Sequence, residues 1–355
     1  MTIYYIIFFY LIFLFFLDTS LKKIEGVLLY FLTFFLFSLF VGLRFEVGGD
    51  WFNYLSEFES TSKKKDIFSS FNEVSDFFHT IIMYFFSKIG LSFYYVNILY
   101  SSIFFVCLYF YLKRETKPWL ALLIAYPYLI TVVSIGYSRQ SVALGLIFIS
   151  FLSLINKKNL YFYFLIIIAA SFHRSAIIFI ILPFFMDTKF NYFKIFLISI
   201  ILLVLYLLFK DNYDRMFYYY LGDGIHFSSK GAMPRLLFSV SAAIIFFITK
   251  NLIFENKIEK KIYLLHSIGI LILTPFIYMY STFVDRILVY FYGLQLIIFS
   301  RVSHVFLNII YRNLINFLII FIFFIYFHIW INLGNYSSNW YPYQTIFTTN
   351  ESRKK

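Results

Sequence analysis

Apolar runs long enough to form helical membrane spans recur along this whole chain. A helix needs about 20 mostly apolar residues to cross the hydrocarbon core of a bilayer, and slightly shorter runs suffice inside a bundle. The sequence therefore predicts an all-α polytopic membrane protein, a single transmembrane domain over residues 1–355 with a bundle of about 12 transmembrane helices. The expected spans lie at about 3–17, 26–43, 93–112, 118–135, 139–155, 160–172, 174–186, 193–209, 235–249, 262–281, 286–300 and 314–331.

Composition excludes most other classes of protein. Of the 355 residues, 61% are hydrophobic and 14% are charged, whereas soluble domains carry about 25% charged residues. A soluble enzyme or a disordered chain would need more polar surface, and the single Cys107 has no partner for a disulfide within the chain. The net charge of +12 does not indicate nucleic-acid binding, because the basic residues stand in small groups between apolar runs, as in membrane proteins.

Lysines and arginines in the short loops predict the orientation of the chain, because such loops face the cytoplasm. All the basic loops lie on the cytoplasmic side of the membrane only under two conditions. Residues 68–90 must form an interfacial or re-entrant helix, and residues 160–186 must form two short passes broken at 171–175. Two long loops, at about 44–92 and 210–234, then face outward, and loops of this length are usually functional. The basic groups lie at 22–23, 113–117, 157–158, 189–194, 250–261 and 301–312.

Charged residues beside the outer ends of the spans form four clusters, and charge at membrane depth indicates a functional site by default. The first cluster contains Arg44, Asp50 and Tyr54. Arg44 offers a planar fork of donors that suits phosphate or carboxylate. The two glycines before Asp50 permit a tight turn that could fold Asp50 back towards Arg44. The alternative is an Arg–Asp pair that caps a helix and orders the loop.

The second cluster opens the expected span at 139–155. Ser138 is a plausible N-cap, which places Arg139 and Gln140 in the first helical turn. A cation beside the positive end of the helix dipole is unfavourable unless the site holds an anion. We therefore expect anion binding at Arg139, with snorkelling of Arg139 to the interface as the alternative.

The third and fourth clusters lie at the break near residue 173 and at the start of a late span. His173 can act as an acid, a base or a hydrogen-bond donor, or it can be a satisfied polar group at a helix end. Arg174 beside it can face headgroups. Arg286 is expected to begin a helix on the outer side, with Asp285 either neutralising it or capping the helix.

Other patterns carry less information. The loop at 210–234 combines charged and aromatic residues, which could form a surface for an acceptor sugar or simply a solvated loop. The sequence contains no Walker A motif, no GxGxxG within a strand–helix unit and no HExxH motif. Its histidines lack metal-ligand spacing. We therefore expect no metal, nucleotide or other cofactor.

The charged clusters occur in a characteristic order. They are Leu43-Arg44 with Gly49-Asp50 and Tyr54, then residues 139–143, then residues 172–176, then Asp285-Arg286 with Tyr290-Phe291, and finally residues 340–343. This ordered set resembles the EpsG family, a branch of the Wzy-type O-antigen and capsule polymerases, and the resemblance extends over essentially the whole chain.

The resemblance implies a metal-independent glycosyltransferase with a GT-C-like architecture. Such a polymerase transfers a growing glycan from undecaprenyl pyrophosphate onto a lipid-linked oligosaccharide repeat unit, on the outer side of the bacterial cytoplasmic membrane. The donor carries its own leaving group, so the reaction requires no nucleotide sugar. The expected partners are the undecaprenyl-pyrophosphate-linked oligosaccharide, membrane lipids and a separate chain-length regulator, with no nucleic acid.

These expectations assign roles to particular side chains. Arg139 and Arg286 should hold pyrophosphate, with Arg44 supporting them. His173 is the favoured general base for the attacking hydroxyl, and Asp50 is the other candidate. Further contacts to pyrophosphate or glycan are expected from Tyr54, Gln140, Arg174 and Tyr290.

Two alternative functions fit the same composition. A lipid-linked oligosaccharide flippase or other transporter would also place cations at membrane depth, but it should spread them along a path between both faces. An O-antigen ligase would use the same donor with a different acceptor, and only its product would distinguish it.

Overall fold

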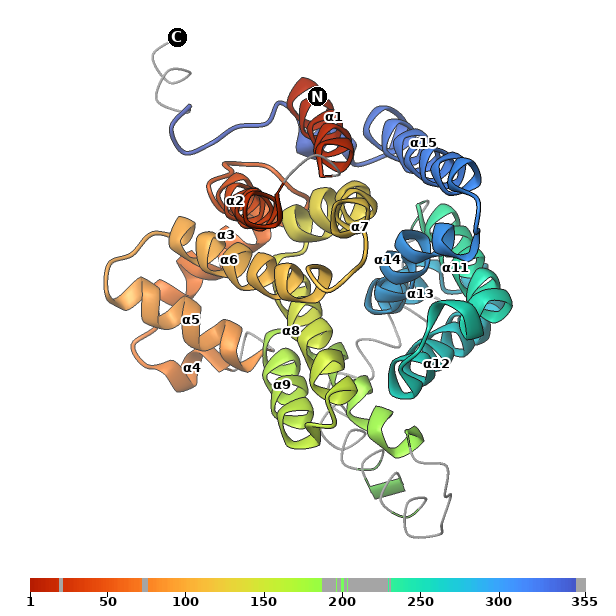
Figure 1. Ribbon diagram of the computed structural model, residues 1–355. Coiled ribbons are helices and arrows are strands. Elements are labelled where there is room, and N and C mark those ends of the chain that lie inside the picture. The colour runs from red at the N-terminus through yellow and green to blue at the C-terminus, as the bar shows by residue number, and fades with distance from the viewer. Residues whose placement is uncertain are drawn as a thin grey trace.

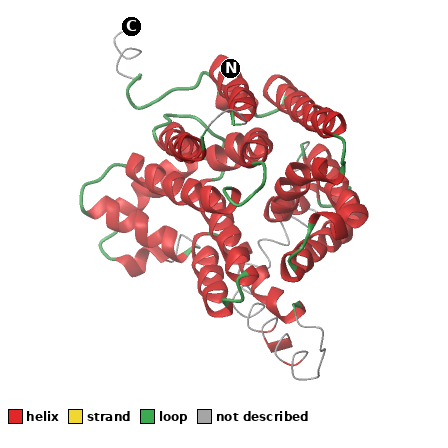
Figure 2. Cartoon of the chain, in the orientation of Figure 1, coloured by secondary structure: helices red, strands yellow, loops and turns green. Residues whose placement is uncertain are grey.

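The computed structural model describes residues 1–18, 22–71, 76–186, 229 and 231–348, together with residues 196, 199, 200 and 203. Within these residues the chain is almost entirely helical, as Figures 1 and 2 show. The extended pairing found there is an isolated bridge between Arg44 and Thr345. The expected all-α architecture is therefore confirmed for the described part of the chain.

Within the described stretches 1–18, 22–71, 76–186 and 231–348, successive helices are joined by short connections. In chain order they are α1 (Thr2–Leu17), α2 (Lys23–Gly42), α3 (Trp51–Ser62), α4 (Ile67–Phe71), α5 (Phe77–Lys88), α6 (Phe93–Leu112), α7 (Pro118–Ala125), η1 (Tyr126–Ser134), α8 (Ser138–Ile155), α9 (Asn159–Phe172), η2 (Arg174–Phe185), α11 (Ala232–Ile253), α12 (Lys257–Leu273), η3 (Thr274–Ile277), α13 (Ser281–Leu288), η4 (Val289–Phe291), α14 (Tyr292–Arg301), η5 (Val302–Val305), α15 (Ile309–Leu333) and η6 (Ser337–Trp340).

Seven helices in the described residues are long and apolar enough to cross a membrane. They are Lys23–Gly42, Phe93–Leu112, Ser138–Ile155, Ala232–Ile253, Lys257–Ile277, Ser281–Val305 and Ile309–Leu333. Four shorter apolar helices coincide with expected spans, at Thr2–Leu17, Pro118–Ser134, Asn159–Phe172 and Arg174–Phe185. The expected span at 193–209 lies largely outside the described residues. A multi-pass membrane protein is thus supported, and the count of about 12 spans stays a prediction.

The centre of the bundle is α7 with its continuation η1, a π-helical stretch that contains Pro127. Every residue from 119 to 135 is buried, as expected for a helix that is apolar on all sides. It packs against α1, α6, α14 and α15, and Figure 1 shows it between the two halves of the chain. The carbonyl of Thr131 accepts a hydrogen bond from Nε1 of Trp340 at 2.6 Å, which anchors the C-terminal segment in this core.

The region expected as the first long outer loop, 44–92, contains three short helices, α3, α4 and α5. None of them is among the candidate spans, so the expectation that residues 68–90 do not cross is supported. The three helices form a layer in which α3 packs on α5, and α5 packs on α6 and α9. Their depth in the membrane stays a prediction.

The helical break near residue 173 is confirmed. α9 ends at Phe172, His173 has an extended backbone with φ −154° and ψ 110°, and a 3₁₀ helix begins at Arg174. The two segments are therefore not one continuous helix.

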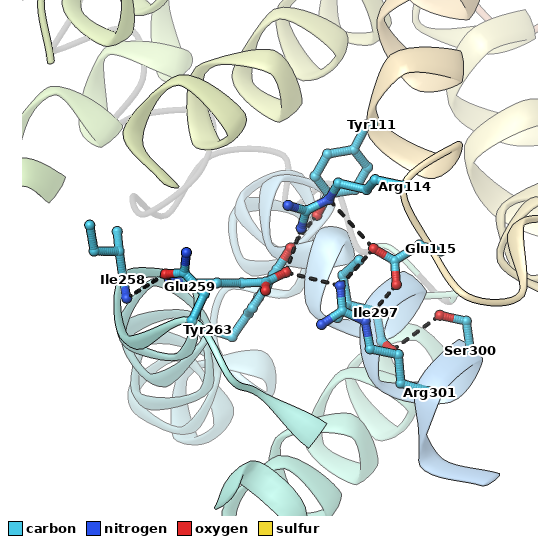
Figure 3. A network of polar contacts seen from close by, with 10 residues as sticks. Tyr111, Arg114, Glu115, Ile258, Glu259, Tyr263, Ile297, Ser300 and Arg301 are labelled. Atoms are coloured by element: carbon cyan, nitrogen blue, oxygen red, sulfur yellow. Dashed lines mark hydrogen bonds and ion pairs between the residues drawn. The ribbon is translucent and has the colours of Figure 1, made fainter. Parts of the chain in front are cut away.

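Charged residues gather at the two ends of the bundle. At one end, Arg114 contacts Glu259 and Arg301 contacts Glu115, which brings three of the basic loops together (Figure 3). At the other end, Asn97 near the start of α6 accepts a hydrogen bond from Arg44. Since Asn97 and Arg114 are 17 residues apart along α6 and just beyond its end, the two groups of charges are separated by roughly 25 Å.

Candidate functional site

A polar cavity of about 440 Å³ lies where α3, α8 and α13 meet. It is lined by two arginines, two carboxylates and three neutral polar groups: Arg139, Arg286, Asp50, Glu57, Asn53, Tyr54 and Ser56. The charges thus come from segments that are up to 236 positions apart in the sequence, between Asp50 and Arg286. Convergence of opposite charges in one cavity is the arrangement expected of a site for an anionic, hydroxyl-rich ligand.

Asp50 reaches this cavity because of the turn that precedes α3. Gly48 has φ +109°, and a Cβ there would lie 2.5 Å from the carbonyl oxygen of Ile135, so this turn requires glycine. Asp50 then occupies the N-cap position of α3, but its carboxylate does not cap the helix. It accepts a hydrogen bond from Asn53 at 3.4 Å and is otherwise directed to the arginines of the cavity.

Burial raises the pKa of Asp50 above its usual range, although the positive charges of Arg286 and Arg139 oppose this effect. A carboxyl group in these surroundings can take up a proton more readily than an exposed aspartate. Asp50 therefore combines access to the cavity with proton affinity, the two properties that a general base requires.

Arg139 lies in the first turn of α8, as predicted. Its guanidinium contacts Asp76 at 3.2 Å and Glu57 at 3.8 Å, and it stacks over the ring of Tyr54 at 5.1 Å. These partners hold the guanidinium at the edge of the cavity without closing it off, since a quarter of the side chain (24%) stays exposed. The expectation that Ser138 is the N-cap is wrong, because α8 begins at Ser138 itself.

A second cavity, of about 530 Å³, lies on the other side of Arg286, which lines both. Gln140 also lines it and donates a hydrogen bond to the backbone carbonyl of Arg286 at 3.1 Å. Arg235 and Asp285 form a paired wall with two contacts of 2.5 Å. The aromatic part of the wall consists of Tyr128, Tyr137, Trp330, Tyr336 and Trp340.

An apolar groove of about 380 Å³ adjoins the second cavity between α11 and α15. The two share Arg235, Trp330 and Asn335 among their lining residues. The rest of the groove is made mainly of Phe238, Ile322, Ile325, Ile329 and Leu333. A polar cavity that continues into an apolar groove suits an amphiphilic ligand.

Four of the residues predicted from sequence meet at the first cavity: Asp50, Tyr54, Arg139 and Arg286. Gln140 joins them from the second cavity. Arg286, however, lies in the last turn of α13 and does not begin a helix. The alternative that Asp285 caps that helix is also wrong, because α13 begins at Ser281. The close contacts of Asp285 are with Arg235 and Ser229.

Arg44 is placed differently from the prediction. Its side chain is 1% exposed and donates to the carbonyls of Val41 and Val47, to Asn97 and to Ser138. It lines neither of the two cavities and makes no contact with Asp50 among its hydrogen bonds, so the expected Arg44–Asp50 pair is not formed. Arg44 instead ties the end of α2 to α6 and α8. Burial of this charge is tolerated because the guanidinium donates four hydrogen bonds.

The residues around the break lie beside the cavities. The ring of His173 stands 6.5 Å from that of Tyr290, whose hydroxyl is 2.7 Å from the hydroxyl of Ser175. Arg174 contacts Asp76 at 3.9 Å through its side chain. His173, Arg174 and Tyr290 do not belong to the lining of the cavities described above.

Glu57 and Asp76 were not singled out from the sequence, yet both contact Arg139. A helical pattern could have revealed Glu57, since Asp50, Tyr54 and Glu57 follow at i, i+4 and i+7 on one helical face. Among the described residues, no group of three or more His, Cys, Asp or Glu is placed to hold a metal ion. The loop at 210–234, suggested for the acceptor sugar, lies largely outside the described residues.

Comparison with known protein families identifies a match to this chain. The sequence model of the EpsG family matches residues 27–345, nearly the whole chain. No curated protein and no solved structure matches the chain.

Proposed function

Because the chain belongs to the EpsG family, whose members are Wzy-type polymerases and polysaccharide biosynthesis proteins, we propose that it is a polysaccharide polymerase of the cytoplasmic membrane. It transfers a growing glycan from undecaprenyl pyrophosphate onto a lipid-linked repeat unit on the outer side of that membrane. The observation that supports this reaction best is the shared cavity of Arg139, Arg286 and Asp50.

The two arginines suit the leaving group of the reaction. Cleavage of the bond between the anomeric carbon and the pyrophosphate oxygen leaves the electron pair, and hence added negative charge, on pyrophosphate. Guanidinium groups bind such oxyanions through parallel hydrogen bonds and need no metal ion to do so. Arg286 lies between the two cavities and Arg139 lies at the edge of the first, so both can approach one pyrophosphate group.

Asp50 suits the acceptor side of the same step. The hydroxyl oxygen of the acceptor sugar attacks the anomeric carbon, and its proton passes to the carboxylate of Asp50. This assignment replaces His173, the favoured base from sequence, because Asp50 lines the cavity with both arginines. Arg44 has a structural role in this proposal and does not bind pyrophosphate.

The second cavity and the groove suit the carrier lipid. A polyprenyl pyrophosphate is an amphiphile whose charged end needs cations and whose chain needs apolar surface. Arg286 is at one side of the second cavity, and the groove between α11 and α15 adjoins it at Arg235 and Trp330. We infer that the donor lipid occupies these two spaces and the acceptor sugar occupies the first cavity.

This function can be tested by complementation of a strain that lacks its own copy of the gene, with the surface glycan examined on gels. The wild-type chain should restore long glycan chains, and Arg139→Ala and Arg286→Ala should not, at equal protein level in the membrane. Long chains in both variants would contradict the proposal. The chain would instead be a transporter if the purified protein moved lipid-linked repeats across the membrane of vesicles without lengthening them.

A further inference from the structure

One buried histidine next to the first cavity has no role in the proposed reaction. His79 on α5 is 0% exposed. Its Nε2 is 2.9 Å from a carboxylate oxygen of Glu57 on α3, and its Nδ1 is 2.7 Å from the hydroxyl of Tyr100 on α6. Three helices thus meet in a chain of hydrogen bonds that ends on a carboxylate of the cavity wall.

An ionised Glu57 determines the protons of this chain. The N–H at Nε2 of His79 then donates to Glu57 and the hydroxyl of Tyr100 donates to Nδ1, which leaves His79 neutral. Burial lowers the pKa of His79 to about 4, although the hydrogen bond that His79 donates to Glu57 opposes this effect. Burial raises the pKa of Glu57, but the hydrogen bond from His79 and the charge of Arg139 outweigh it, so the net shift is downward.

The first cavity therefore contains two carboxylates in opposite surroundings. The pKa of Asp50 is raised and that of Glu57 is lowered. Two carboxyl groups whose pKa values are shifted in opposite directions can have different roles. Asp50 is then suited to exchange protons, and Glu57 is suited to stay charged. Glu57 is 31% exposed at its side chain, and its second oxygen is 3.8 Å from Arg139, so it retains room to accept hydrogen bonds from a ligand.

We propose that Glu57 binds hydroxyl groups of the acceptor sugar and that His79 and Tyr100 are positioning residues that fix its carboxylate. This inference rests on the proposed function and adds the residue that orients the acceptor. The charged and titratable groups that face Glu57 are His79 and Arg139, with Asp50 in the same cavity. Each sugar hydroxyl that donates to a charged carboxylate strengthens binding more than a neutral hydrogen bond would.

Steady-state kinetics with separate donor and acceptor test the inference. The donor is the lipid-linked repeat unit extracted from the deletion strain, and the acceptor is the same repeat unit as an octyl glycoside, which has no pyrophosphate to lose. Glu57→Gln should raise the acceptor KM about tenfold, because a hydrogen bond to a charged group is lost. The donor KM and kcat should change less than about threefold. A raised acceptor KM with an unchanged kcat is expected when a residue binds the acceptor equally well in the ground state and the transition state.

Glu59→Gln is the matched control, since it removes the same charge from an exposed position on the same helix. Tyr100→Phe provides a second variant in case Glu57→Gln does not fold. It removes the O–H that fixes the histidine proton, and it should raise the acceptor KM about threefold, as expected for a weaker, indirect effect. The acid limb of the pH–rate profile should persist in Glu57→Gln, because Asp50 and not Glu57 accepts the proton. It should move slightly to lower pH, because the negative charge of Glu57 contributes to the raised pKa of Asp50.

The outcomes separate the two proposals. If wild-type protein lengthens glycans and Glu57→Gln leaves the acceptor KM unchanged, or loses the acid limb, the inference about Glu57 is wrong and the polymerase function stands. If wild-type protein adds no repeat unit, the proposed function fails and this inference fails with it.

Discussion

The two charged ends of the bundle use similar residues in different ways. In the network of Figure 3, Arg301 contacts Glu115 at 2.6 Å and Glu259 at 3.0 Å, and Arg114 contacts Glu259 at 2.5 Å. At the other end, Arg139 contacts Asp76 at 3.2 Å and Glu57 at 3.8 Å. The contacts of Arg301 and Arg114 are short, whereas the contacts of Arg139 are longer and border a cavity.

This difference separates structural charges from charges that can bind a ligand. The carboxylate of Glu115 is 0% exposed and that of Glu259 is 9% exposed, so nearly all of their hydrogen-bonding capacity is used within the protein. Glu57 and Arg139 are 31% and 24% exposed and line a cavity. We conclude that the network joins α12 and α14 to the α6–α7 connection, while Glu57 and Arg139 keep part of their surface exposed to the cavity.

The largest effect on activity is expected from the base. Asp50→Asn should lower kcat/KM about 100- to 10,000-fold, the usual contribution of a general base. In the wild type the rate should fall as pH decreases, because Asp50 must be ionised to accept a proton. Since its pKa lies above the ordinary 3.8, this fall should begin at a higher pH than for an exposed aspartate. A normal rate in Asp50→Asn would remove Asp50 from the mechanism.

The next effect is expected from the arginine between the cavities. Arg286→Ala should slow elongation about 100- to 1,000-fold, as loss of a charge-stabilising donor does. The charge of Arg286 also opposes the rise in the pKa of Asp50, so the acid limb of the residual activity should move to higher pH. Initial rates of elongation across a pH series measure both effects. A rate near wild type, or a limb that moves to lower pH, would contradict this assignment.

Substitutions in the Arg301–Glu115 network should lower the stability of the protein without changing its catalytic rate. Arg301→Met leaves the buried Glu115 without its closest partner and should destabilise the protein by about 3–5 kcal/mol. Thermal unfolding in detergent measures this loss, and elongation per folded molecule should change less than about threefold. Pairing the change with Glu115→Leu should recover most of the stability, because buried ion pairs can be replaced by apolar residues. A large loss of specific activity in folded Arg301→Met would show that the network takes part in function.

The smallest effect is expected at His173. This residue is not part of the lining of the described cavities, so His173→Asn should change the elongation rate less than about threefold. The comparison with Asp50→Asn on the same gels decides which of the two is the base. A loss of 100-fold or more in His173→Asn would restore the histidine as the candidate.

The sequence allowed much of the architecture to be predicted. Apolar runs reveal helices because each must hide its backbone from lipid. The break at His173 was predicted from the basic loops, which otherwise fall on opposite sides. Before α6 only one helix, over residues 68–90, was expected, and the structure has three short helices there. The number of spans could not be fixed, because several helices are shorter than a bilayer and one expected span lies outside the described residues.

The site was predicted only in part. Arg139, Arg286 and Asp50 stand out because charge is rare in such a sequence, and the structure brings them to one cavity. Arg44 stands out equally but is a buried structural group, and only its hydrogen bonds to α6 and α8 reveal this. The sequence also does not reveal which arginine pairs with Asp285. Asp285 is adjacent to Arg286 in the sequence, but its ion pair in the structure is with Arg235.

Mass spectrometry of the lipid-linked products made by the purified protein tests the polymerase mechanism without reference to cells. The wild-type chain, supplied with extracted lipid-linked repeats and EDTA, should form products that grow by whole repeat units and should release one undecaprenyl pyrophosphate for each unit added. Arg286→Ala should do so at least about 100-fold more slowly. Repeats that stay at single-unit length with the wild-type protein would contradict the polymerase function. An equal rate with Arg286→Ala would show that Arg286 does not catalyse glycan transfer.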